Sequence, residues 1–221
     1  MRTKSYATAV VLFDEVELLD VTGPISVLSS AGRQWNFQPF KIDLVAHAVG
    51  PITTRSALSL HATHDLATHS GAECLIIPGG YGARRAAESD ELLAWVRRSA
   101  ASAELVAAIG NGAWVLAKAG LLDDQEIAVG PDLAAEISAC CPRARPNPHS
   151  ALCTSGKLLS ARASALGLDL SCEIVSRCFG KKLASALSAS LGIDWSGELS
   201  ALDFVAAPLL ATPESTGRGV K

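Results

Sequence analysis

Short apolar runs alternate along this chain with longer segments of helical pattern, and this alternation constrains the fold more than any other feature of the sequence. Apolar runs bounded by glycine, proline or charge are typical of strands buried on both faces, and helical connections between them are typical of a parallel sheet. The strands that we predict lie at residues 9–13, 41–46, 73–77, 105–109, 152–154 and 158–161. The helices that we predict begin near Pro24 and Ser89 and lie at 113–119, 132–141, 166–178 and 181–191. We therefore expect an α/β fold with a mostly parallel sheet covered on both faces, and a small hairpin at residues 52–61.

The length of the chain, 221 residues, fits one α/β domain with a core large enough to fold without disulfides. There is no repeat and no linker of domain size, so we expect one domain over residues 1–195 and a loose tail over 196–221. The net charge of −3 gives no general attraction to nucleic acid or to an anionic membrane. The apolar run near the N-terminus is too short for a secretory signal or a membrane span. We expect a cytoplasmic protein that binds neither nucleic acid nor membrane.

The cysteine and glycine patterns give no sign of a metal or a nucleotide cofactor. The six cysteines lie at positions 74, 140, 141, 153, 172 and 178, and none forms a C-x-x-C pair or a zinc-site spacing with histidine. We expect them to be reduced, partly buried thiols. The sequence has no G-x-G-x-x-G that opens a first strand–helix unit and no G-x-x-x-x-G-K-[ST], so we expect no cofactor.

Three segments are expected to meet where a site should lie, because ligands of open parallel sheets bind at the carboxyl ends of the strands. These are Asp20 after the first strand, Gly79-Gly80 after the third, and Gly110-Asn111-Gly112 after the fourth. Each has two interpretations. Asp20 could be a general acid or base, or a cap for the helix near Pro24. The glycine pair could supply oxyanion-hole N–H groups or simply turn the chain, and Gly-x-Gly could be a nucleophile elbow or any tight turn.

Taken together, these segments resemble the ThiJ/PfpI (class I glutamine-amidotransferase-like) family, and within it the isonitrile-hydratase-like branch. The matching stretches are residues 12–24 (LFDEVELLDVTGP), 75–82 (LIIPGGYG), 112–123 (GAWVLAKAGLLD) and 160–170, which contains Gly167 and Asp169 in a Gly-x-Asp pattern. The resemblance runs from about residue 7 to residue 192. It implies a flavodoxin-like three-layer sandwich with a nucleophile-elbow-type turn, and it implies a homodimer.

The chain departs from the family pattern at two positions. The family carries a reactive cysteine on the elbow, where this chain has Gly110 followed by Asn111. Many relatives in the branch also carry a histidine at the position that corresponds to Gly130. A glycine has no side chain with which to form a covalent intermediate, so elbow-based covalent catalysis is excluded here. The acidic residue of the branch, thought to work there as acid and base, remains as Asp20.

Two functions follow from these residues. The first is a hydratase, lyase, isomerase or cyclisation enzyme of specialised metabolism, with Asp20 and Asn111 as catalytic residues. In it Gly79, Gly80, Tyr81, Gly110, Gly112 and Gly130 would contact the substrate, and the N–H groups of Gly80 and Asn111 would hold developing negative charge. The second is an inactive member of the family that binds a ligand or regulates a partner. The two differ in whether Asp20 faces an accessible space beside Asn111 or whether Trp114 or Tyr81 fills it.

Overall fold

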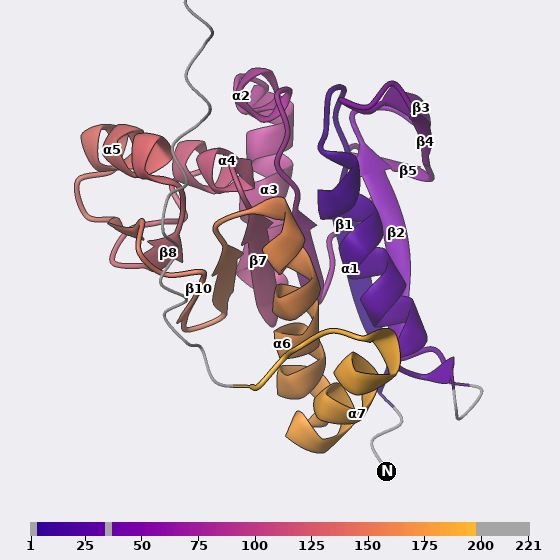
Figure 1. The fold of residues 1–221 in the computed structure, drawn as a ribbon. Coiled ribbons are helices and arrows are strands. Elements are labelled where there is room, and N and C mark those ends of the chain that lie inside the picture. The colour runs from indigo at the N-terminus through magenta and orange to yellow at the C-terminus, as the bar shows by residue number, and fades with distance from the viewer. Residues whose placement is uncertain (1–3, 34–36, 198–221) are drawn as a thin grey trace, which may run out of the picture.

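The computed structural model describes residues 4–33 and 37–197. Within them, seven strands form one sheet in the order β10-β11-β7-β6-β1-β2-β5 (Figure 1). Neighbouring strands are parallel, except that β10 runs antiparallel to β11 at one edge. The strands are β1 (Tyr6–Val11), β2 (Phe40–Ala46), β5 (His64–Asp65), β6 (Cys74–Ile77), β7 (Leu105–Ile109), β10 (Leu152–Ser155) and β11 (Leu158–Ala161).

The central strands are buried on both faces. Every residue of β6, β7 and β11 is buried, and so are five of the six residues of β1. This burial explains why the strands are continuous apolar runs rather than alternating ones. The carboxyl ends of β1, β6 and β7 lie side by side, because the three strands are hydrogen-bonded neighbours in the sheet.

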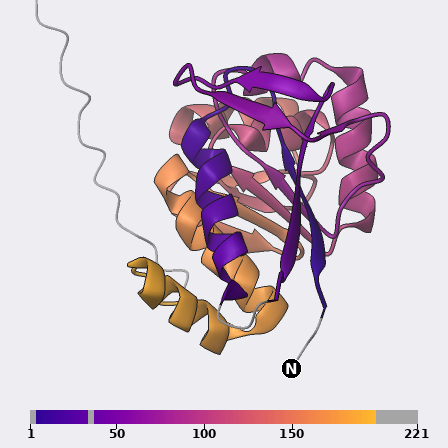
Figure 2. The ribbon, with the colours of Figure 1, turned by 90° about the vertical axis from the view of Figure 1, so that its right-hand side faces the viewer.

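Helices cover both faces of the sheet (Figures 1 and 2). On one face, α1 (Leu18–Ser30) packs against α6 (Gly167–Phe179), and α6 packs against α7 (Lys181–Leu191). On the other face lie α3 (Asp90–Ser102) and α4 (Gly112–Lys118), with α2 (Ala83–Ala86) and α5 (Pro131–Cys140) in contact with α4. The result is the three-layer α/β sandwich that the sequence predicts.

Smaller elements complete the described chain. β3 (Gly50–Thr53) and β4 (Ser59–Ala62) form an antiparallel hairpin, as predicted. β8 (Glu126–Ala128) pairs in parallel with β9 (Arg145–Asn147), and a 3₁₀ turn at Ser164–Leu166 precedes α6. Within the described residues, no helix has the length and apolar character needed to cross a membrane. The predicted tail lies outside the described residues from position 198 onward.

Two predicted boundaries are wrong: the first strand, expected at residues 9–13, is Tyr6–Val11, and the start of the first helix is further off. We expected a helix to begin near Pro24, but α1 begins at Leu18 and Pro24 lies inside it. A proline in that position cannot donate the helical hydrogen bond to the carbonyl four residues earlier, which belongs to Asp20. The error matters for the site, because Asp20 lies in the first turn of the helix and not at its cap position, which is Glu17.

Candidate functional site

The carboxyl of Asp20 lies between the start of α1 and the loop after β6. Its side chain is 1% exposed, and its Oδ2 accepts a hydrogen bond of 2.8 Å from the backbone N–H of Gly79. The loop that leads to it is held by the backbone of the same glycine, since the N–H of Glu17 donates to the carbonyl of Gly79 at 2.9 Å. Asp20 is therefore bound to the neighbouring loop and does not act as a helix cap.

The second oxygen of Asp20, Oδ1, is buried and makes no hydrogen bond of normal geometry, although the Ser164 hydroxyl lies close enough to the carboxyl to lower its pKa. Among the described residues, none donates a hydrogen bond to Oδ1. Burial raises the pKa of Asp20, and the nearby charge of Glu17 raises it further, while the Ser164 hydroxyl and the Gly79 N–H act in the opposite direction. A buried carboxyl whose pKa is raised mainly by desolvation holds its proton to higher pH and can serve as a general acid.

Gly110 has the conformation of an elbow residue. It joins β7 to α4 with a φ of +53°, in the left-handed region that favours glycine. Its N–H donates to the carbonyl of Ala161 at 2.8 Å, which anchors the turn to β11. Apart from its two chain neighbours, the described residues place one atom within 4 Å of a Cβ built on Gly110, the Oδ2 of Asp20 at 3.9 Å. The position where an elbow side chain would project is thus open space beside the Asp20 carboxyl.

Asn111 is engaged with Gly80. The Gly80 N–H donates to Oδ1 of Asn111 at 2.7 Å, and Nδ2 of Asn111 donates back to the Gly80 carbonyl at 2.9 Å. We expected the Asn111 amide and the Gly80 N–H to face a substrate, and the structure instead pairs them with each other. The backbone N–H groups of Asn111 and Gly112, at the start of α4, meet no acceptor in the part of the chain that the structure describes.

Three of the expected substrate-binding glycines are required for close packing. A Cβ on Gly79 would lie 2.6 Å from Oδ1 of Asn111 and 2.8 Å from Oδ2 of Asp20. On Gly80, whose φ is +125°, it would lie 2.4 Å from the carbonyl oxygen of Glu15, and on Gly112 it would lie 2.4 Å from that of Ile77. The sequence places these glycines at the site, and their lack of side chains is what lets the three loops touch.

The aromatic residues near the site leave the space over Gly110 open. Tyr81 is 65% exposed, and its hydroxyl accepts a hydrogen bond of 2.8 Å from Arg55, which also reaches toward Glu17. Trp114 is half-buried, and the guanidinium carbon of Arg84 lies over its ring, 5.0 Å from the ring centre. Neither ring lies within 4 Å of a Cβ built on Gly110.

Gly130 lies at the N-cap of α5, where a Cβ would meet nothing within 4 Å. Its contact with a substrate stays a prediction. Sequence reasoning did not single out Ser164 or Glu17, although both affect the pKa of Asp20. Ser164 lies in residues 160–170 and Glu17 in residues 12–24, two of the stretches that carry the family resemblance. Their place in these stretches could have indicated that they lie near the site.

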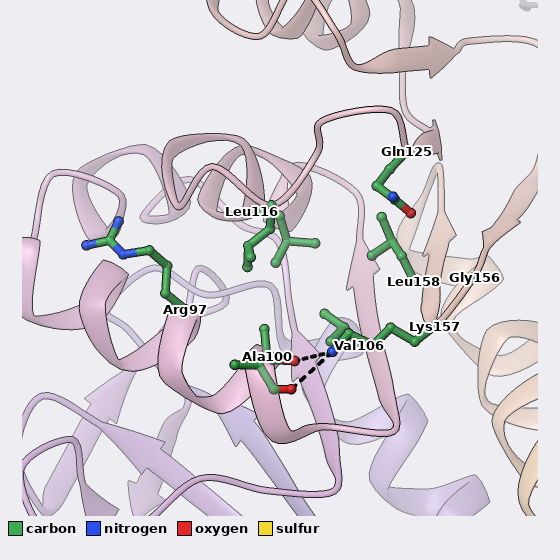
Figure 3. A pocket seen from close by; sticks show the side chains of 10 residues that line it. Arg97, Ala100, Val106, Leu116, Gln125, Gly156, Lys157 and Leu158 are labelled. Atoms are coloured by element: carbon green, nitrogen blue, oxygen red, sulfur yellow. Dashed lines mark hydrogen bonds between the residues drawn. The ribbon is translucent and has the colours of Figure 1, made fainter.

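A separate cavity of about 310 Å³ lies at the opposite ends of the strands (Figure 3). Val106 and Leu158, near the starts of β7 and β11, line it together with Leu116 of α4. At its rim, Nζ of Lys157 donates to the carbonyl of Ala100 and, at 3.3 Å, to that of Ala103. The lysine therefore caps the C-terminal end of α3, and this cavity is distinct from the Asp20 site.

The described residues hold no group of three or more histidine, cysteine, aspartate or glutamate side chains that could bind a metal ion. Neither Cys74 nor Cys153 is activated to replace a nucleophile on the elbow. Cys74 is fully buried and desolvation raises its pKa far above the usual range, while burial raises the pKa of Cys153 to about 11. Both thiols are therefore protonated near neutral pH.

A family model described as the DJ-1/PfpI family matches residues 7–177, which is most of the chain. The chain belongs to the DJ-1/PfpI family. This membership confirms the ThiJ/PfpI resemblance and the flavodoxin-like fold that it implies.

Similar proteins include both an enzyme and a regulator. The isonitrile hydratase of Pseudomonas putida is 32% identical over 111 residues, an alignment that covers 50% of this chain and 46% of that enzyme. A ThiJ/PfpI family protein from Pseudomonas syringae has a TM-score of 0.78 and 21% identity, with 86% of this chain and 76% of that chain covered. An AraC family transcriptional regulator from Pseudomonas putida has a TM-score of 0.71 and 24% identity, with 84% and 99% covered. This chain is similar in fold to both of these solved structures.

Proposed function

We propose that this protein is a small-molecule enzyme of the hydratase, lyase, isomerase or cyclisation type, in which Asp20 transfers a proton without a covalent intermediate. One observation carries the proposal. The Asp20 carboxyl is buried, has one unpartnered oxygen and a raised pKa, and borders the open space over Gly110. The oxygen that faces the space over Gly110 is Oδ2, so a substrate there would meet the carboxyl through Oδ2, while the orphan Oδ1 is a buried polar atom of a kind that is rare in folded proteins.

The proposal includes loss of the cysteine nucleophile. The elbow residue is Gly110, which keeps the strained backbone of the turn but has no side chain. The protonated thiols of Cys74 and Cys153 do not replace it, since the thiolate is the reactive form of cysteine. What the site retains is acid–base chemistry, with a contribution of about 10²- to 10⁴-fold in rate from a well-placed proton donor.

Hydration of an isonitrile illustrates the chemistry that one carboxylic acid can support. Protonated Asp20 gives its proton to the terminal carbon of R–N≡C, and the oxygen of a water molecule bonds to the same carbon. The carboxylate then takes a proton from that water, and the product tautomerises to the formamide R–NH–CHO. Asp20 ends as it began, and no atom of the protein becomes bound to the substrate. Removal of the elbow side chain leaves room for a substrate bulkier than a simple isonitrile.

The surrounding groups have supporting roles in this proposal. The N–H groups of Asn111 and Gly112 stabilise charge that develops on the substrate, since they point from the start of a helix. The Asn111 side chain acts as a positioning residue that holds the Gly80 loop against α4. Gly110 and Gly130 border the substrate, and Tyr81 lies at the entrance. We further propose that the protein is a homodimer, which is the expectation from the family resemblance.

One observation favours the alternative, a ligand-binding or regulatory protein. Two of the expected polar contacts for a substrate, the Asn111 amide and the Gly80 N–H, are satisfied within the protein. Because these polar groups are already paired with each other, they do not need a substrate to complete their hydrogen bonds. Asp20 would then be a remnant acid under a space that holds a ligand without changing it.

Incubation of the protein with a panel of isonitriles, nitriles and carbonyl compounds separates the two functions. Loss of each compound and formation of product are followed by NMR, and binding is followed by thermal shift in the same samples. The enzyme predicts that at least one compound is converted and that the mass of the intact chain stays unchanged during turnover. Compounds that raise the melting temperature and are recovered unchanged across the panel would instead support the binding protein.

A further inference from the structure

Two adjacent cysteines at the end of α5 form a pair of thiols in contact. Cys140 is the last residue of α5 and Cys141 is its C-cap, and their Sγ atoms lie 3.5 Å apart. Cys140 is exposed, whereas the other cysteines apart from this pair are all buried. The pair lies against α4, because Sγ of Cys141 donates to the carbonyl of Ala117 at 3.6 Å. Neither sulfur belongs to the Asp20 site.

A disulfide between them is an unfavourable product. Adjacent Cα atoms are about 3.8 Å apart, shorter than the roughly 4.4–6.8 Å that disulfides prefer, so the ring would be strained and easily reduced. The backbone of Cys141 is held in place, since its N–H donates to the carbonyl of Ile137 at 2.7 Å and its carbonyl accepts from Ala144 at 2.9 Å. Two thiols fixed in this way are better placed to share a third atom than to bond to each other.

The separation of the sulfurs selects the kind of atom that can bridge them. With bonds of about 2.3 Å to each sulfur, a typical length for a metal thiolate, a 3.5 Å separation corresponds to an angle of about 99° at the bridging atom. A linear two-coordinate centre such as Cu(I) or Hg(II) would need sulfurs roughly 4.6 Å apart by the same bond length. Zinc prefers four protein ligands or three and a water, and the described residues contain no such group. A pyramidal centre with bond angles near 100° fits, and trivalent arsenic has that geometry.

We propose that Cys140 and Cys141 form a chelating site for trivalent arsenic and its monosubstituted organic compounds. With phenylarsine oxide, two As–S bonds form, the As–O bond breaks, and the oxygen leaves as water with the two thiol protons, so no oxidant or reductant is needed. The product carries no charge at arsenic. Burial and the neighbouring Cys140 raise the pKa of the Cys141 thiol to about 11, so these surroundings disfavour a charged sulfur and suit a neutral product.

The two sulfurs act as a chelate. Once the exposed thiol of Cys140 has bonded to arsenic, the second thiol reacts within the same molecule. Such intramolecular steps typically strengthen binding by about 10²- to 10⁴-fold. A chelate of this kind resists a monothiol, which offers one sulfur at a time, and yields to a small dithiol, which forms a ring of its own.

Titration of the full chain with phenylarsine oxide, followed by intact-mass spectrometry, tests the site. The expected result is one phenylarsenic group per chain that survives excess glutathione and is removed by dithiothreitol. Cys140→Ser and Cys141→Ser should each lower retention against glutathione by about 100-fold. Cys153→Ser, which changes a buried thiol elsewhere, should leave retention unchanged. Circular dichroism of each variant reports whether it is folded.

A second measurement on the unaltered protein needs no variant. Brief treatment with iodoacetamide under native conditions should alkylate the exposed Cys140 first, and this should abolish the glutathione-resistant adduct. The proposal is overturned if the folded protein takes up no arsenical. It is equally overturned if both serine variants, or the protein alkylated at Cys140, retain the group as the parent does.

Discussion

At the scale of single residues, the site is defined by which glycines lack room for a side chain. Gly79→Ala would place a Cβ 2.6 Å from Oδ1 of Asn111, 2.8 Å from Oδ2 of Asp20 and 2.9 Å from the carbonyl oxygen of Ile109. Overpacking of this kind destabilises by about 1–3 kcal/mol. Gly130→Ala is the matched control, because its Cβ would meet nothing within 4 Å, and it should change stability by less than about 0.5 kcal/mol. Urea unfolding of both variants measures the difference, and equal midpoints would contradict the geometry.

The buried carboxyl of Asp20 predicts a specific dependence of stability on pH. Its pKa is raised in the folded protein, so the folded state becomes less stable as pH rises from the unfolded value of about 4 through the folded value. Asp20→Asn removes that charge and can still accept from the Gly79 N–H. The variant should therefore be more stable than the parent above the raised pKa, and the gain should vanish below pH 4. Free energies of unfolding measured across this pH range test the prediction. Asp132→Asn, which removes the charge of an exposed carboxylate, is the control.

At the scale of elements, the Asn111 side chain joins the loop after β6 to the start of α4. Asn111→Ala leaves the N–H of Gly80 without its partner, while the Gly80 carbonyl still accepts from the N–H of Ala83 at 3.1 Å, and an unpaired N–H costs about 1–3 kcal/mol. We expect faster amide hydrogen exchange at Gly80 in addition to the lower unfolding free energy. Gln125→Ala is a suitable control, because its amide makes one long contact of 3.4 Å, with the carbonyl of Asp123. Unchanged exchange at Gly80 would show that the amide pair does not hold the loop.

Elements were predictable where their own residues carry the signal. The helix α3 begins as expected because Ser89 is an N-cap whose side chain accepts from the N–H of Leu92. The start of α1 was missed because its N-cap, Glu17, makes no side-chain cap bond and because Pro24 suggested a later start. The strands β5, β8 and β9, with two or three residues each, are too short to show a period.

At the scale of the whole molecule, parallel strand order predicts which residues meet, but not how they pair. Asp20, Gly79 and Gly110 follow strands that are neighbours in the sheet, so the rule that ligands bind at the carboxyl ends of strands brings them together from sequence alone. The pairing of Asn111 with Gly80 depends on how closely the loop after β6 approaches the start of α4. The contact of Cys140 with Cys141 depends likewise on rotamers at a helix end, and neither is encoded in a residue pattern.

The central claim is that Asp20 transfers the proton in a reaction without a covalent intermediate. The most direct measurement is the ratio of kcat/KM between the parent and Asp20→Asn, on the panel compound that the parent converts fastest. We predict a loss of about 10²- to 10⁴-fold in the variant, with substrate binding retained and with Gln125→Ala, a change at the separate cavity, close to the parent. If Asp20→Asn converts the compound as fast as the parent does, Asp20 is not the proton donor and the proposed mechanism is wrong.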